Sequence, residues 1–394
     1  MIAAYAWEWL NLLGRAVHVV AGIAWIGASF YFVWLDNHLQ SPADAAAQAR
    51  GVGGELWAVH GGGFYHAQKY LGAPPALAPR LHWFKWEAYT TLLSGLFLLV
   101  LVYYLQADLY LVDREVASLP APVAVAAGVA WIVAGWLVYD LLCRSPLGAR
   151  QRALAGVVAL LCAAAAYALC RMFSGRGAFL HFGAMLGTIM VLNVFFAIIP
   201  AQRAMVQAVT AGRAPDLARN ARARQRSVHN TYFTLPALFA MISIHYPWVY
   251  GAPLNWLWLV TISAAGALVR AYFVARHRGR APLWMLVAAA AALLATAYGL
   301  QPRTVANPWA VDAAHVRKIA AERCAPCHSA TPRFPGIAAA PKGIALDDLA
   351  QLRRHAPLAR PQLVSRAMPP GNVTGMTDDE RAALIAWIDD AHGR

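Results

Sequence analysis

Eight long apolar stretches constrain this chain more than any other feature, because each approaches the about 20 residues that a helix needs to cross a bilayer. Only 13% of the 394 residues are charged, about half the fraction of ~25% that is usual in soluble domains. The sequence therefore predicts an all-α fold, a polytopic membrane bundle of eight transmembrane helices. The predicted spans are residues 10–35, 86–107, 120–143, 153–173, 178–200, 231–250, 254–275 and 282–300.

Basic residues favour one side of this predicted bundle. The net charge of +14 comes mainly from arginines in the connections between apolar stretches, a topology signal and not a nucleic-acid surface. The first, third, fifth and seventh connections hold most of them, for example Arg144, Arg222 and Arg276, and are predicted to be cytoplasmic. Both termini would then be periplasmic, in a bacterial inner (plasma) membrane. No basic region precedes the first stretch, so no cleavable signal peptide is expected.

The segment Cys324–His328 has the C-x-x-C-H spacing at which a c-type haem is attached. Cys324 and Cys327 would bind the vinyl groups, and His328 would be the proximal iron ligand. A zinc site would need two more Cys or His ligands nearby, and a thioredoxin-like pair would need a βαβ context. The sequence offers neither, so the motif favours a covalent haem.

A loop methionine follows at Met368, beside Pro369 and Pro370. It suits the sixth iron position, where Met together with His raises the reduction potential. Met376 is a poorer candidate, because it lies just before a predicted helix. The sequence predicts a class I-like cytochrome c domain, with helices over 311–323, 347–355 and 377–392, the last opened by a Thr377/Glu380 capping box. The predicted division is a transmembrane domain over 1–300, a linker over 301–310 and a periplasmic cytochrome c domain over 311–394.

The first connection, residues 36–85, is too long to be a simple link. It contains three glycines between His60 and Phe64, and we expect a short helix or a strand pair at the cytoplasmic face. Glycines permit positive φ and close approach of a ligand. The alternative is a flexible turn between two interfacial pieces, since glycine is also ordinary turn chemistry.

Histidines inside spanning helices point to function by default. His18, His181 and His245 are predicted at similar depth, near the periplasmic ends of their helices. Two of them, His18 and His181 foremost, are candidate ligands of a b-type haem, with Arg15 meeting a propionate. The alternative is that each histidine only hydrogen-bonds across helices.

Together these features resemble the bacterial membrane-bound urate oxidase (urate hydroxylase) family, in which a spanning domain is fused to a C-terminal cytochrome c. The resemblance covers essentially the whole chain. The segments that carry it are Gly14–His18, Ala24–Gly27, His60–His66, His82–Glu87, Cys324–Ser329 and Met368–Pro370.

This resemblance implies oxidation of urate to 5-hydroxyisourate, with electrons passing to the haem c and not directly to oxygen. Urate would bind at the cytoplasmic mouth, and a downstream periplasmic acceptor or cytochrome oxidase would receive the electrons. Electrons would have to cross a hydrocarbon layer of ~30 Å, so an intramembrane cofactor is expected. A heme b is the candidate. The candidate bases are His60, His66 and Glu87, and the candidate substrate contacts are Gly62, Phe64, Lys69, Trp83, Lys85 and Trp86.

Two other functions compete with this interpretation. A quinol-oxidising cytochrome c electron-transfer subunit would need no cytoplasmic pocket and leaves the glycine-rich connection unexplained. A metal transporter with a fused cytochrome would want paired Met or Cys residues in the spans, and the methionines are scattered.

Overall fold

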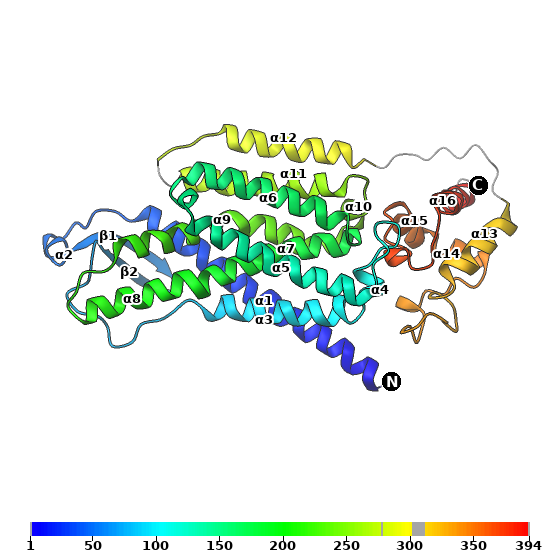
Figure 1. Cartoon of the computed structure of the whole chain (residues 1–394), viewed down its shortest axis with the longest axis horizontal. Coiled ribbons are helices and arrows are strands. Elements are labelled where there is room, and N and C mark those ends of the chain that lie inside the picture. Colours follow the sequence, from blue (N-terminus) through cyan, green and yellow to red (C-terminus); the bar gives the residue numbers. More distant parts are fainter. Residues whose placement is uncertain (1, 277–278, 302–311, 393–394) are drawn as a thin grey trace.

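The protein, seen in a computed structural model, is described over residues 2–276, 279–301 and 312–392. Long helices lie roughly side by side, a β-hairpin lies at one end of the bundle, and the C-terminal domain lies at the other (Figure 1). We call these the hairpin end and the C-terminal end. The predicted linker, 301–310, falls almost wholly outside the described residues.

The bundle is built from long helices interrupted by short turns. In chain order the helical elements are α1 (Ile2–His38), α2 (Ala45–Ala49), α3 (Trp86–Leu98), η1 (Leu99–Tyr104), α4 (Ala107–Tyr110), α5 (Ala121–Arg144), η2 (Pro146–Ala149), α6 (Gln151–Cys170), α7 (Gly175–Asn193), η3 (Val194–Ile198), α8 (Ile199–Thr210), α9 (Leu217–Ile242), η4 (Ser243–His245), α10 (Pro247–Tyr250), α11 (Asn255–Arg276) and α12 (Trp284–Gly299). Of these, η1 and η3 are π-helical turns.

Helix α7 is the centre of the bundle and packs against α5, α6 and α9. Phe173, Phe179 and Phe182 are fully or almost fully buried around it. By contrast, α1 lies at the rim, packs mainly on α3 and exposes Leu and Val side chains on its outer face. Exposed apolar faces of this kind suit contact with lipid.

Six helical segments of the described chain are long and apolar enough to cross a membrane. They are Tyr5–His38, Trp86–Tyr104, Ala121–Arg144, Gln151–Cys170, Gly175–Thr210 and Asn255–Arg276. The other two predicted spans correspond to α9, whose first turns are rich in arginine, and α12, which has 16 residues. Length and composition thus support six of the eight predicted spans.

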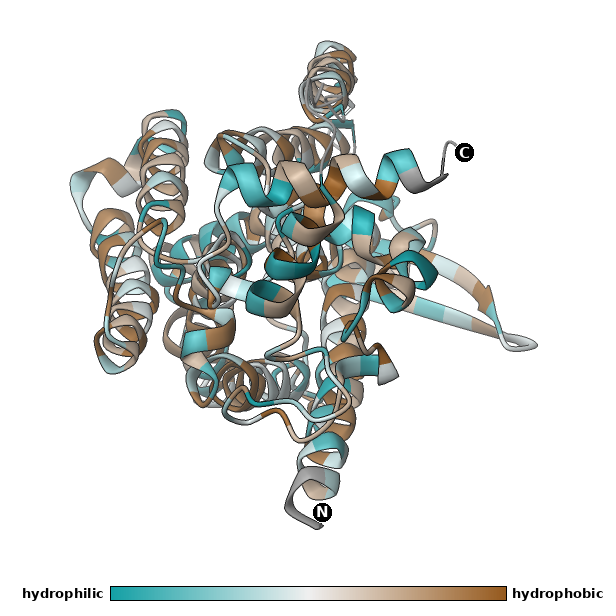
Figure 2. Cartoon of the chain, turned by 90° about the vertical axis from the view of Figure 1, so that its right-hand side faces the viewer, coloured by the Kyte–Doolittle hydropathy of each residue, from teal (hydrophilic) through white to brown (hydrophobic). Residues whose placement is uncertain are grey.

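The expectation of an all-helical chain needs one correction. Strands β1 (Val52–His60) and β2 (Gly63–Tyr70) pair antiparallel, with His60 opposite Gly63. Gly61 and Gly62 have φ of 57° and 80°, the positive values that a two-residue hairpin turn requires. The strand pair expected as one alternative in the first connection is therefore present, and Figure 2 shows it projecting to the side of the bundle.

The fifth connection also differs from prediction. The sequence predicts one span ending at residue 200, a basic connection, and a new span starting at Thr231. Instead α7, η3 and α8 run on to Thr210, and α9 begins at Leu217. Its start is fixed by Asp216, whose side chain accepts a hydrogen bond from the Arg219 backbone N–H at 3.0 Å.

The C-terminal domain has a hydrophobic core of its own, which includes Ile319, Leu352 and Leu384. The predicted capping box is confirmed, because Thr377 and Glu380 exchange side-chain-to-backbone hydrogen bonds of 2.8 and 3.2 Å. The structure adds a helix, α15, that the sequence did not indicate. The elements are α13 (Ala313–Ile319), the π turn η5 (Ala320–Cys324), η6 (Pro341–Gly343), α14 (Leu349–Arg354), α15 (Ala356–Val364), η7 (Pro370–Asn372) and α16 (Asp378–His392).

Candidate functional site

The C-x-x-C-H motif folds into a tight turn directly after η5. The backbone N–H groups of Cys327 and His328 both donate to the Cys324 carbonyl, at 3.2 and 2.9 Å. The His328 ring places Nδ1 3.0 Å from the Ile344 carbonyl, and because a carbonyl only accepts, Nδ1 carries the proton. Nε2 is then left to bind a metal, the arrangement usual for ligating histidines. These residues fit a covalent haem with His328 as the proximal ligand.

Cys324 and Cys327 are not joined to each other by a disulfide. Burial raises the pKa of the Cys324 thiol to about 11 and also raises the pKa of Cys327. Redox-active C-x-x-C pairs work through a lowered thiol pKa. Burial shifts the pKa of these thiols in the opposite direction.

The two candidate axial methionines lie in different surroundings. Met368 is 36% exposed in the loop before η7, whereas Met376 is 1% exposed inside the domain core. Arg381 fixes the loop, because its Nη1 donates to the Met368 carbonyl at 2.6 Å. Met376 contributes to packing, which leaves Met368 as the better candidate for the iron.

Arg323 and Glu380 join the motif to α16, with Nη2 to Oε1 at 2.9 Å. Burial raises the pKa of Glu380, but the hydrogen bonds from Arg323 and from the Thr377 N–H outweigh it, so the net pKa is lowered. A lowered carboxyl pKa stabilises the fold above the unfolded-state value, ~4.3 for Glu, and this stability is lost as the pH falls through the folded-state pKa.

We expect Glu380→Gln to destabilise the C-terminal domain by about 1 kcal/mol at neutral pH and to reduce its loss of stability in acid. The measurement is thermal unfolding followed through the haem absorbance from neutral pH to about pH 3. Asp379→Asn, at an exposed neighbour, is the control. Equal acid sensitivity of the wild type and Glu380→Gln would contradict the assignment.

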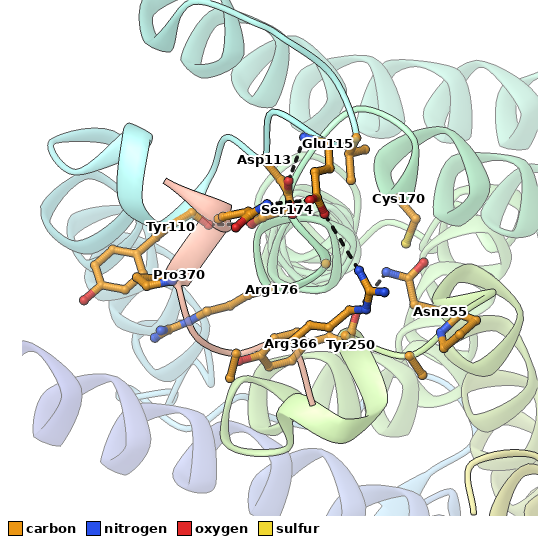
Figure 3. A pocket seen from close by; sticks show the side chains of 18 of the residues that line it. Tyr110, Asp113, Glu115, Cys170, Ser174, Arg176, Tyr250, Asn255, Arg366 and Pro370 are labelled. Atoms are coloured by element: carbon orange, nitrogen blue, oxygen red, sulfur yellow. Dashed lines mark hydrogen bonds and ion pairs between the residues drawn. The ribbon is translucent and has the colours of Figure 1, made fainter. Parts of the chain in front are cut away.

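A cavity of about 430 Å³, the interdomain cavity, lies where the Met368 loop meets the bundle. Tyr110, Ser174 and Asn255 line it from the bundle. Figure 3 shows Glu115 of the bundle and Arg366 of the C-terminal domain pointing toward each other, 3.8 Å apart. Asn372 Nδ2 also donates to the Glu115 carboxylate. The C-terminal domain therefore docks on the bundle through the loop that carries Met368.

Gly371 makes the closest approach in this contact. Its φ is 55°, and a Cβ there would lie 2.4 Å from the Val112 carbonyl oxygen. We expect Gly371→Ala to push the loop off the bundle and to speed hydrogen exchange in bundle residues 109–116. Gly375→Ala is the matched control, because Gly375 also has a positive φ but its Cβ would contact only Arg323, at 3.9 Å. Equal exchange in the two variants would argue against the docked arrangement.

The predicted substrate residues of the first connection lie on the hairpin. His66 Nε2 is 2.8 Å from a Glu55 carboxylate oxygen, and its ring stacks on Trp57 at 4.0 Å. The hydrogen bonds from the Ala43 N–H and from His66 lower the pKa of Glu55. Lys69 pairs with Asp36. His60 is the last residue of β1, Gly62 lies in the turn that follows, and Phe64 is 80% exposed.

The predicted residues at the start of α3 are held separately. Trp83 packs with Val194 and Ile199, and Lys85 lies over the Trp86 ring at 5.2 Å. Glu87 occupies the first turn of α3. None of these side chains, nor those on the hairpin, lines the interdomain cavity or the arginine cavity described below. The predicted substrate residues are thus divided between the hairpin and the start of α3.

The three predicted intramembrane histidines also lie apart. His18 Nδ1 contacts the Thr91 carbonyl and Ser94 Oγ, both at 3.1 Å. His181 is fully buried, and its ring nitrogens bond to the Gly177 carbonyl at 2.8 Å and to Tyr104 at 3.2 Å. His245 is exposed in η4, and Arg15 bonds to Asn11. As placed, these residues do not form a shared haem cradle.

A buried polar network links α5, α7 and α9, and the sequence did not reveal its partners. Arg226 donates to Asp140 at 2.7 Å and to Asn193 at 3.1 Å. Asn193 in turn donates to Asn230 at 2.9 Å. Tyr139 bonds to His229 Nδ1 at 2.8 Å. His229 thus lies within α9 and belongs to this network.

Beside this network is a cavity of about 220 Å³, which we call the arginine cavity. Arg144, Arg219, Arg222 and Arg226 line it, with Asp140 as the one acidic side chain. The spacing of the arginines along the sequence could have revealed this cluster. Residues three and four apart share a helix face, and α9 has arginines at 219, 222 and 226. Taken as a basic connection, these arginines indicate only membrane topology.

A sequence profile of the family described as urate oxidase N-terminal matches residues 4–301. The chain belongs to the urate oxidase N-terminal family. No curated protein and no solved structure matches it. Membership in the urate oxidase N-terminal family indicates an oxidoreductase that acts on urate, and it confirms the urate part of the resemblance seen in the sequence.

The candidate features of this urate oxidase family member fall into two groups, those inside the matched residues and those beyond them. The hairpin, the polar network and the arginine cavity lie inside the matched residues, whereas the C-x-x-C-H turn and Met368 lie beyond them. The family match therefore covers the bundle and the hairpin but not the C-terminal domain. The C-terminal domain contributes the residues that fit a haem.

Proposed function

We propose that this protein oxidises urate to 5-hydroxyisourate within the membrane bundle and delivers the electrons to a haem c on its C-terminal domain. The observation that carries the proposal is that one chain joins a urate oxidase N-terminal segment, residues 4–301, to a turn in which His328 leaves Nε2 free for iron. Cys324 and Cys327 would hold the haem covalently, and Met368 would be the distal ligand.

The reaction balances without oxygen as the direct acceptor. Urate and one water give 5-hydroxyisourate, two protons and two electrons. When bound, a c-type haem accepts one electron at a time, so the transfer is stepwise and a downstream periplasmic acceptor or cytochrome oxidase must take electrons onward. The sequence predicts His60, His66 and Glu87 as candidate bases for proton removal, but none of them lines the interdomain cavity or the arginine cavity.

The proposed topology has eight crossings of a bacterial inner membrane, with α9 and α12 completing the six apolar spans. The positive-inside rule places the arginine-rich hairpin end in the cytoplasm and the C-terminal domain in the periplasm. The opposite positions of these two parts in Figure 1 support this orientation. Urate would then be met on the side where purine breakdown supplies it.

An intramembrane haem b, with ligands among His18, His181 and His245, stays a prediction from the sequence. Both ring nitrogens of His181 are already hydrogen-bonded, and His245 is exposed. Because these placements do not fit a shared haem, we derive no electron-transfer step through one. A visible spectrum of the purified protein, with and without His18→Ala, tests this point: a b-type band lost in the variant would support the haem.

The decisive experiment is anaerobic addition of urate to the purified full chain while the c-type haem absorbance is followed. We expect urate to reduce the haem, with two haems reduced per urate, and 5-hydroxyisourate to form. Reduction by quinol and not by urate would replace the proposal with the quinol-oxidising alternative. Reduction by cuprous copper alone would favour the metal-transport alternative.

A further inference from the structure

We propose that the arginine cavity is the binding site for the urate anion, an inference that rests on the proposed function and names its substrate site. The cavity lies between the end of α5, the π turn η3 and the first turns of α9. Its volume of about 220 Å³ suits one bicyclic purine better than a larger cofactor, since drug-sized ligands occupy pockets of roughly 300–1,000 Å³.

The charge of the cavity selects an anion. Four arginines face one carboxylate, that of Asp140. Asp140 is bound by Arg226 and by Arg144, each at 2.7 Å. Arg219 and Arg222 lie exposed at the mouth, and within the described part of the chain neither makes a salt bridge. The pKa of nearby Asp216 is lowered by the hydrogen bond from the Arg219 backbone N–H and further by the charges of these two arginines. Their guanidinium donors can therefore meet a ligand. Arginine forks recognise planar oxyanions through paired hydrogen bonds.

The floor of the cavity is fixed in advance. Arg226 is only 5% exposed and is held by Asp140 and Asn193. Gln225 Nε2 donates to the Gly148 carbonyl at 2.7 Å, which ties α9 to the α5–α6 connection. A floor held by so many hydrogen bonds loses little freedom when a ligand arrives, which favours binding.

The wall of the cavity supplies an apolar surface and an irregular helix. Phe196 and Ala197 belong to η3, and π turns within helices occur frequently at functional sites. The Phe196 ring packs against Trp136 with centroids 5.1 Å apart. An aromatic wall opposite arginine donors is the combination that a flat, charged heterocycle requires.

A proton acceptor lies within the same network. Asn193 bonds to Arg226 at 3.1 Å and to the Tyr139 hydroxyl at 3.2 Å, and Tyr139 continues to His229 at 2.8 Å. His229 and Tyr139 therefore form a hydrogen-bonded pair one residue removed from the cavity floor. This pair offers a route for a proton that leaves the bound purine.

The test is equilibrium binding of urate to the full chain in discs of neutral phosphatidylcholine. We expect Arg219→Gln and Arg222→Gln each to raise the Kd for urate about tenfold, as loss of one charge-assisted hydrogen bond would. Arg224→Gln is the matched control, because Arg224 lies on the same helix but does not line the cavity. Its Kd is expected to stay at the wild-type value.

Other outcomes overturn the inference. If Arg219→Gln and Arg222→Gln bind urate as tightly as Arg224→Gln while His66→Ala binds weakly, the hairpin is the site. If the arginine variants instead lose retention of anionic phosphatidylglycerol and keep the Kd for urate, the cavity is a lipid headgroup site. Haem reduction tests the proposed function separately from the proposed urate site. A wild type that binds urate through these arginines without reducing the haem would refute the proposed function but not the binding site.

Discussion

Replacing His328 with alanine is expected to lower the urate-dependent haem signal by at least about 100-fold, the largest effect of any single substitution considered. The variant loses the imidazole that the Ile344 carbonyl orients at 3.0 Å. No other ring nitrogen of the described motif turn is available to replace it. The measurement is the c-type absorbance of the purified chain before and after anaerobic urate.

His315→Ala provides the control for this result. His315 is an exposed histidine on α13, in the same small domain. We expect its replacement to leave the haem spectrum and the response to urate unchanged. A His328→Ala variant with a normal spectrum and normal reduction would remove the C-terminal domain from the electron path.

Replacing Arg226 with methionine is expected to lower the free energy of unfolding of the bundle by about 3–5 kcal/mol, because one partner of a buried ion pair is removed. The side chains of Arg226 and Asp140 are 6% and 15% exposed. The change leaves the Asn193 carbonyl without its donor and Asp140 with only the exposed Arg144. The measurement is denaturant or thermal unfolding of the purified chain in lipid discs.

Two further variants make the Arg226 result specific. Arg224→Met, on the exposed side of α9, should cost less than about 0.5 kcal/mol. In the double variant Arg226→Met/Asp140→Leu, the loss should be smaller than the sum of the two single losses, since the pair acts as a unit. A loss in Arg226→Met no greater than in Arg224→Met would mean that the pair is not buried.

Much of this architecture was predictable because strong local signals agree with the fold. Apolar runs of span length located the bundle, and the C-x-x-C-H turn and the Thr377/Glu380 capping box folded as their patterns indicate. The glycines at 61 and 62 marked a turn, which the structure shows as a hairpin. In each case the signal is contained in a few neighbouring residues.

The features that the sequence missed depend on pairings between distant residues. Arg226 looked like part of a basic loop, and only the approach of α5 and α7 to α9 reveals its contacts with Asp140 and Asn193. Depth along a helix likewise suggested that His18 and His181 lie together. In the structure the two histidines meet the α3–η1 run at different heights. His18 contacts Thr91, whereas His181 contacts Tyr104, about 20 Å further along that helix at 1.5 Å per residue.

The length of the segment from Gly175 to Thr210 affects how a solute reaches the arginine-bearing turns of α9. Its 36 residues rise about 54 Å at 1.5 Å each, whereas the hydrocarbon layer is ~30 Å thick. A third or more of this rod must therefore stand clear of the lipid tails, as a stalk beside the arginine-bearing turns of α9. A charged metabolite arriving from the aqueous phase would meet the stalk first and need not partition into the bilayer.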